Sequence, residues 1–183
     1  MRKKLKIAGF SVSIILVVVA VILLYPLMYK GSDDIIIAED HNFSSLKDII
    51  SQDRFKDKTV FIDMWGTTCA PCIKEFDYAG ELKERYKDEA VEFLYLCSID
   101  RIDHKVRWKD IIKQKQLAGY HVPIDGTLYE SIWDKHLSEP IESKYWIPRY
   151  FIVKGGNIVI GKAAHPSSKD KLYNQIDSVL NLK

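Results

Sequence analysis

The sequence predicts an α/β domain, a mixed central sheet flanked by helices, preceded by one hydrophobic N-terminal segment. From residue 59 onward, stretches with strand-like and helix-like spacing of apolar residues alternate, which is typical of parallel strands joined by helices. Near the C-terminal end, a Gly-rich turn joins two further strand-like runs and adds an antiparallel hairpin. The chain has 183 residues, which suffices for one such core and an appendage.

The N-terminal segment has the features of a membrane anchor. Residues 1–6 are basic, and residues 7–29 carry no charge. As a helix they would reach about 35 Å, enough to cross a hydrocarbon core of roughly 30 Å. Bulky residues follow the apolar run, whereas a cleaved signal peptide would end in small ones. We expect residues 7–29 to form an uncleaved transmembrane signal-anchor helix, residues 30–34 a linker and residues 35–183 the folded domain.

The position of the positive charges predicts the orientation of this anchor. Four basic residues precede the apolar run, which favours an N-terminus that stays in the cytoplasm. The folded domain would then lie in the periplasm, attached to a bacterial inner membrane by a single span. Residues 1–30 hold five of the 27 Lys and Arg residues and none of the 25 acidic ones, so the remainder has 22 basic and 25 acidic residues. This slightly negative balance gives no reason to expect nucleic-acid binding.

The first half of the domain alternates between helix and strand. Residues 43–50 indicate a short helix that starts at Ser44 or Ser45. Residues 59–65 are a dense apolar run, as in a strand that is buried on both faces. From residue 70 to residue 87 apolar residues recur every three or four positions, which predicts a helix.

The second half continues this order and ends in a hairpin and a helix. The patterns predict a strand over 91–100, a helix over 106–117, an extended piece over 120–124 and a helix over 128–136. Residues 149–153 and 158–161 form the hairpin, and Ser167 or Ser168 would cap a last helix.

The motif Cys69-Ala70-Pro71-Cys72 follows the first strong strand and opens a helix. Chemistry in such sheets collects at the carboxyl ends of the strands. A thiolate attacks disulfides, and the helix start lowers the pKa of the first cysteine. Pro71 suits the first turn because it lacks an N–H. We therefore expect Cys69 to be the attacking nucleophile and Cys72 the resolving thiol.

Two carboxylates are candidates for proton transfer at this site. Asp63 interrupts a buried run, where desolvation would raise its pKa toward the working pH of a base that deprotonates Cys72. A solvated Asp at the strand end is the alternative. Glu75 lies three residues after Cys72 on the same helical face, and it could tune the thiols or simply complement the helix dipole.

Residues 61–76, FIDMWGTTCAPCIKEF, resemble the active-site segment of thioredoxin-like proteins, and most closely that of the TlpA/ResA-like membrane-anchored branch. Residues 146–153, WIPRYFIV, resemble the cis-proline strand of that family, and residues 154–159, KGGNIV, its hairpin. The resemblance covers most of residues 35–183 and implies a thioredoxin-like fold. Thr68 departs from the pattern, because the family often has Trp there, and so does the dipeptide that begins with Ala70.

The resemblance also implies roles for individual residues. Asp63 takes the place of the buried acid, Glu75 that of the glutamate characteristic of the branch, and Pro148 that of the cis-proline beside the active site. The Ile147 backbone would then pair with an extended partner. The residues expected to contact the substrate are Trp65, Ala70, Pro71, Ile147 and Pro148.

The leading hypothesis is a thiol-disulfide oxidoreductase that reduces protein disulfides outside the cytoplasmic membrane. Its partners would be protein disulfide or dithiol substrates and a membrane or periplasmic electron donor. The redox-active Cys69–Cys72 disulfide would need no other cofactor. A thiol peroxidase is one alternative, and a Cu(I)-binding protein or metallochaperone is another.

The remaining cysteine and the histidines carry no comparable signal. Cys97 ends the second strong strand, and we expect it to be buried as a small hydrophobe. The five His residues lie in apparent loops and helix edges, and none stands at metal-site spacing from the Cys motif. We therefore expect no metal site.

Overall fold

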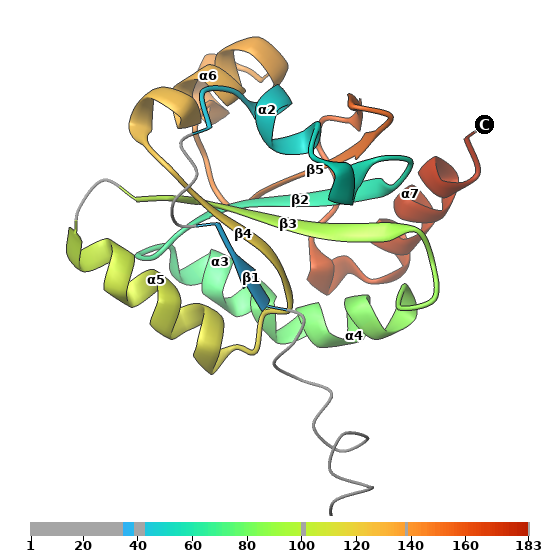
Figure 1. Ribbon diagram of the computed structural model, residues 1–183, viewed down its shortest axis with the longest axis horizontal. Helices are drawn as coiled ribbons and strands as arrows, with labels where there is room; N and C mark the ends of the chain where they lie inside the picture. Colours follow the sequence, from blue (N-terminus) through green and yellow to red (C-terminus); the bar gives the residue numbers. More distant parts are fainter. Residues whose placement is uncertain (1–34, 39–42, 100–101, 138, 183) are drawn as a thin grey trace, which may run out of the picture. The chain divides into compact units, whose positions relative to one another are not determined.

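The computed structural model shows a six-stranded mixed sheet with helices on both faces (Figure 1), and it describes residues 35–38, 43–99, 102–137 and 139–182. The strand order is β1-β4-β3-β2-β5-β6. The strands are β1 (Ile35–Ile37), β2 (Thr59–Gly66), β3 (Val91–Ser98), β4 (Gly119–Ile124), β5 (Arg149–Lys154) and β6 (Asn157–Ile160). The mixed sheet and its flanking helices confirm the predicted α/β class of the folded domain.

Strand β2 lies inside the sheet, between β3 and β5, and all eight of its residues are buried. It pairs in parallel with β3, from Thr59 opposite Val91 to Gly66 opposite Ser98. On its other side it pairs with β5, which runs antiparallel. The hairpin of β5 and β6 was predicted, whereas β1 was missed, since three residues are too few to show a period.

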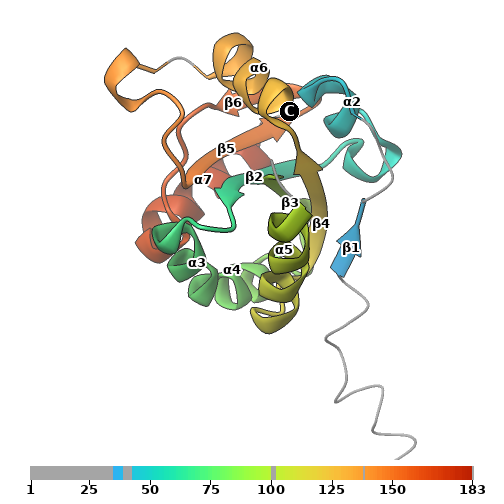
Figure 2. The ribbon, with the colours of Figure 1, turned by 90° about the vertical axis from the view of Figure 1, so that its left-hand side faces the viewer.

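Helices cover both faces of the sheet (Figures 1 and 2). The α-helices are α2 (Leu46–Ile50), α3 (Ala70–Glu75), α4 (Ala79–Arg85), α5 (Ile102–Gln114), α6 (Gly126–His136) and α7 (Asp170–Leu180). The short 3-10 helices are η1 (Asp53–Phe55), η2 (Phe76–Tyr78), η3 (Ile141–Ser143) and η4 (Pro166–Ser168).

These layers enclose two hydrophobic cores, one on each face. The first core lies under α3, α4, α5 and α7, and it includes Trp65, Cys72, Phe76, Tyr95 and Tyr150. The second core lies under α2 and α6, and its members include Ile49, Ile62, Leu94, Ile132 and Phe151. Because side chains alternate along a strand, each sheet residue belongs to one face or the other.

The predicted helix over 70–87 is interrupted. The chain is α-helical in α3, passes through the 3-10 turn η2 and resumes as α4. The spacing of apolar residues does not distinguish these forms, because a 3-10 turn also brings every third residue to one side. The second long helix was predicted to begin at residue 106, but α5 already begins at Ile102.

The helix caps were predicted with mixed success. Ser45 caps α2, and its side chain accepts a hydrogen bond from the Asp48 N–H. The expected Ser cap of the last helix is wrong: α7 follows Lys169, whose φ of 42° is left-handed and whose side chain makes no capping bond. Ser167 and Ser168 belong to η4 instead.

Within the part of the chain that the structure describes, no helix is long and apolar enough to cross a bilayer. The predicted anchor over residues 7–29 and the linker over 30–34 lie outside the described residues, so both stay predictions.

Candidate functional site

A turn connects β2 to α3 at the edge of the sheet where the parallel strands end, the edge that faces the viewer in Figure 2. Cys69 is the N-cap of α3 and is joined to Cys72 by a disulfide. The Cys72 N–H donates a hydrogen bond to the Cys69 Sγ, at 3.2 Å. Pro71 stands in the first turn, where its missing N–H leaves no bond unmade.

The two sulfur-bearing residues differ in their exposure to solvent. Cys69 is partly exposed, whereas Cys72 is 0% exposed and belongs to the first core. Disulfide exchange requires a nucleophile to approach a sulfur atom directly. An incoming thiolate can therefore reach Cys69, while Cys72 is shielded by the protein.

The residues around the disulfide fall into a surface group and a buried group. Ala70 and Pro71 are exposed beside Cys69. Trp65 was expected among the residues that contact the substrate, and this expectation needs correction: its side chain is fully buried. The ring packs edge-on against Phe76, with centroids 4.9 Å apart, so Trp65 supports the site from below.

Asp63 is buried in the middle of β2, as its sequence context predicted. Its neighbours at alternate positions, Phe61 and Trp65, lie in the first core, so its side chain points to the same face as Cys72. Its Oδ1 has no hydrogen-bond partner among the described residues. Burial raises the pKa of Asp63 well above its ordinary range, and the negative charge of Glu75 adds to that rise.

Aromatic rings from the neighbouring strands enclose this carboxyl group. Asp63 stands opposite Tyr95 of β3 and opposite Tyr150 of β5. Both tyrosines are buried, which raises the pKa of each phenol. His121 of β4 stacks on Tyr95 at 4.7 Å, and burial lowers its pKa to about 4. His121 was expected in a loop or helix edge; it lies in the sheet and is fully buried.

Glu75 is held by a segment that lies far away in the sequence. Ser167 donates to it twice, with its backbone N–H and with its hydroxyl, both at 2.9 Å. The Nδ1 of His165 lies 3.6 Å from the same carboxylate. This anchoring explains why Ser167 does not cap α7, and it keeps a negative charge beside the first core.

The segment before β5 closes the site from the other side. The Ile147–Pro148 peptide bond is cis. The Ile147 carbonyl oxygen lies 3.7 Å from the Cys69 Sγ. A Cβ atom at Gly66 would stand 3.1 Å from Ile147 Cδ1, so the small residue at the end of β2 lets this segment approach the disulfide closely.

Other candidates of the sequence lie apart from this constellation. Cys97 is buried at the end of β3, as expected. No group of three or more His, Cys, Asp or Glu side chains among the described residues has the arrangement of a metal site. Ser167 and His165 were not predicted as part of the site, and their distance from Glu75 in the sequence leaves no local signal.

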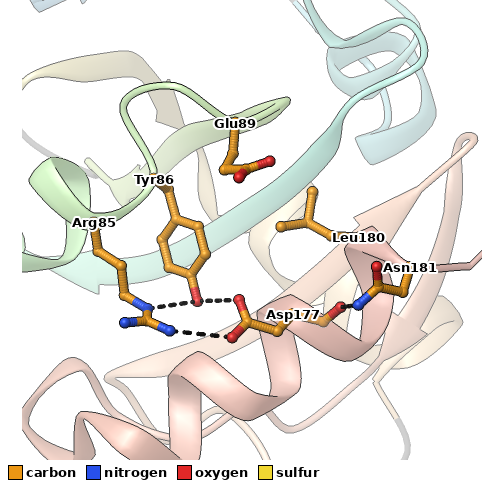
Figure 3. A pocket seen from close by; sticks show the side chains of 6 residues that line it. All are labelled: Arg85, Tyr86, Glu89, Asp177, Leu180 and Asn181. Carbon is orange, nitrogen blue, oxygen red and sulfur yellow. Dashed lines mark hydrogen bonds and ion pairs between the residues drawn. The ribbon is translucent and has the colours of Figure 1, made fainter.

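A polar pocket of about 460 Å³ lies between α4 and α7 (Figure 3). Its lining residues are Arg85, Tyr86, Glu89, Asp177, Leu180 and Asn181. Asp177 accepts from the Tyr86 hydroxyl at 2.8 Å and pairs with Arg85 at 3.2 Å. These polar groups satisfy one another and include no sulfur, so the pocket is separate from the disulfide chemistry.

Comparisons with known proteins agree with this geometry. A family model described as Redoxin matches residues 39–180. Thiol-disulfide oxidoreductase ResA of Bacillus subtilis (strain 168) is 30% identical over 136 residues, which cover 72% of this chain and 73% of that protein. ResA of Bacillus thuringiensis subsp. konkukian is 39% identical over 71 residues, and this match spans 39% of either protein.

Solved structures show the same fold. A putative thiol-disulfide oxidoreductase from Bacteroides vulgatus superimposes with a TM-score of 0.53 at 30% identity, over 68% of this chain and 80% of that one. The thioredoxin domain of another thiol-disulfide oxidoreductase from Bacteroides vulgatus gives a TM-score of 0.55 at 23% identity, over 69% of this chain and 82% of that one.

Proposed function

Since this chain belongs to the Redoxin family and to its ResA-like branch within the thioredoxin superfamily, we propose that it is an enzyme that reduces protein disulfides through Cys69 and Cys72. The observation that carries this proposal is the unequal exposure of the two bonded cysteines next to a buried carboxyl group with a raised pKa. A partly exposed attacking sulfur and a shielded resolving one are what stepwise disulfide exchange needs.

The reaction starts from the reduced protein. The Cys69 thiolate attacks one sulfur of the target disulfide, the target bond breaks and its other sulfur leaves as a thiolate. Cys72 then loses its proton and attacks the Cys69 Sγ. This second step forms the Cys69–Cys72 disulfide and releases the second target thiolate. Two electrons pass to the target, and a dithiol electron donor returns two electrons to the protein.

Asp63 is the group that we assign to accept the proton of Cys72. A carboxyl group transfers protons best when its pKa lies near the working pH, and burial moves Asp63 in that direction. Glu75 adds to this shift because Ser167 holds its charge in place. The backbone N–H of Cys72, which donates to the Cys69 Sγ, would stabilise the Cys69 thiolate in the reduced protein.

Ile147 and Pro148 are assigned to substrate positioning. The Ile147 carbonyl lies beside the Cys69 sulfur, where the backbone of an extended target segment would pass. Exposed Ala70 and Pro71 would contact the same segment from the side of α3. We also propose that residues 7–29 anchor the protein in a bacterial inner membrane, with the redox domain in the periplasm and a membrane or periplasmic electron donor. The uncharged stretch and the preceding basic residues support this arrangement.

Trapping of the mixed disulfide tests this function. Cys72→Ser removes the resolving thiol, so a target protein should accumulate as a covalent adduct on Cys69 and disappear on treatment with dithiothreitol. Cys69→Ser is the matched control, because Cys72 is buried and should capture nothing. The wild-type protein should reduce insulin disulfides, and both variants should lose that activity. Equal trapping by the two variants, or an insulin assay without turnover, would contradict the proposal.

A further inference from the structure

An exposed tryptophan precedes, in the sequence, the residue that lies against the reactive disulfide. The chain has four tryptophans: Trp65, Trp108 and Trp133 are at most 1% exposed, whereas the Trp146 side chain is 70% exposed. Trp146 directly precedes Ile147, whose carbonyl lies 3.7 Å from the Cys69 Sγ. A large indole left in water at this position is available for a contact that the isolated domain does not make.

The segment that carries Trp146 is fixed against α6. The Tyr129 hydroxyl donates to the Tyr145 carbonyl at 2.6 Å, and the Tyr145 hydroxyl donates to Asp134 at 3.0 Å. The Tyr145 ring packs on Trp133, with centroids 6.0 Å apart. Tyr145 has a φ of 68°, a left-handed conformation that a non-glycine residue keeps only when its surroundings hold it. The backbone of Trp146 is therefore already fixed, so less conformational entropy is lost when a partner binds.

Glu139 and Lys144 of the same segment form ion pairs within the protein, whereas Glu142 is exposed. The buried Glu139 carboxylate pairs with Arg149 at 2.6 Å and with Lys162 at 3.1 Å. Lys144 pairs with Asp134 at 2.6 Å. These pairs tie both ends of the segment to α6 and β5, and they leave Trp146 and the 89% exposed Ile141 as apolar side chains directed at solvent.

The exposed residues directly beside Cys69 in the sequence carry no charge, and the first exposed charge on α3 is that of Lys74. Thr68, Ala70 and Pro71 are exposed beside the disulfide. A chain whose cysteine reacts at Cys69 passes between these residues and Ile147. Since consecutive Cα atoms are about 3.8 Å apart, residues one or two positions from that cysteine come within reach of Trp146. The chemistry of the surface favours an apolar side chain there.

We propose that Trp146 is a docking residue that selects extended polypeptide segments with a large apolar side chain within two residues of the target cysteine. This inference rests on the proposed disulfide exchange and specifies its substrate class. This contact is additional to backbone pairing at Ile147, because the indole packs against a side chain of the substrate.

The first test compares two peptides in one assay with the full-length protein. Each peptide carries one cysteine in a mixed disulfide with glutathione, and the residue next to that cysteine is leucine in one and serine in the other. Each rate is divided by the rate of the same variant with glutathione disulfide. The wild-type protein should prefer the leucine peptide by roughly tenfold, which partial burial of one leucine side chain supplies.

Trp146→Ala should reduce this preference to within about twofold, because the contact surface for the leucine is gone. Leu182→Ala is the matched control. Leu182 is also apolar and is 49% exposed. It lies far from the disulfide along β5, because its backbone carbonyl accepts a hydrogen bond from Lys154, at the opposite end of that strand from Pro148. A preference that survives in Trp146→Ala overturns the inference. A protein that reduces neither peptide nor glutathione disulfide instead overturns the proposed function.

The second test needs no catalysis. Because the other three tryptophans are buried, acrylamide should quench chiefly the fluorescence of Trp146. The leucine peptide with serine in place of its cysteine should protect the oxidised protein from quenching, and the serine peptide should protect it much less. Equal protection by both peptides, or protection that rises with protein concentration in the absence of peptide, overturns the inference, since the latter shows a second copy of the chain on this surface.

Discussion

The two hydrophobic cores share one sheet but differ in chemistry. On the second core, under α2 and α6, the buried Arg149 side chain lies over the Trp133 ring and is paired with Glu139. The first core contains Cys72 and the phenol rings of Tyr95 and Tyr150, and it encloses the Asp63 carboxyl group. An unpaired buried carboxyl group destabilises the folded state unless it is protonated. Both faces bury apolar side chains, but the charge on the second is paired, whereas the first holds an unpaired carboxyl group that the proposed reaction uses.

Removing a side chain from the second core tests the first half of this comparison and should give the largest effect. Ile49 of α2 is fully buried, and Ile49→Ala should lower the free energy of unfolding by about 2–5 kcal/mol, because it removes packed methyl groups and leaves a cavity. Urea unfolding measures this loss. The insulin-reduction rate of the still-folded variant should match that of the wild type. A large loss of rate under conditions where the variant is fully folded would show that the two faces are coupled.

Asp63→Asn tests the role of the buried carboxyl group in the first core. It should lower the rate of disulfide reduction while the protein stays folded. Asparagine cannot accept the proton of Cys72, so the release of the target from the mixed disulfide should slow by roughly 10²-fold at pH 7. Pre-forming the mixed disulfide with a labelled peptide and following release of the peptide by stopped-flow fluorescence measures this step. A rate unchanged from that of the wild type would remove Asp63 from the proton transfer.

The same variant should change how stability depends on pH. The folded-state pKa of Asp63 is raised above its unfolded value, which is about 3.9. From that pH upward the unfolded chain gives up a proton that the folded chain retains, so the carboxyl group makes unfolding easier as the pH rises. Asp63→Asn should therefore be more stable than the wild type at neutral pH, by a margin that shrinks toward pH 4. Urea unfolding of both oxidised proteins between pH 4 and 8 measures the margin, and a constant difference would contradict the assignment.

Local patterns in the sequence predicted much of this architecture. The buried run of β2, the spacing of the two cysteines and the capping by Ser45 each depend on neighbours within a few residues. Burial of Asp63 also followed from its position inside an apolar run. These features were predictable because period and capping chemistry act at short range.

The features that the sequence did not predict depend on distant partners. Ser167 has the composition of a helix cap, but Glu75, placed 92 residues earlier, takes both of its donor groups. The exposure of Trp146 follows from packing that no local period encodes. The anchor over residues 7–29 lies outside the described residues and stays a prediction.

The equilibrium reduction potential of the Cys69/Cys72 couple tests the central claim most directly, because it decides the direction of electron flow. Equilibration of the full-length protein with glutathione or dithiothreitol buffers, followed by alkylation of the thiols, gives this value. A protein that reduces its targets should have a potential near that of thioredoxin, about −270 mV. A potential near −120 mV, typical of a strong oxidant, would contradict the account and assign the protein to disulfide formation.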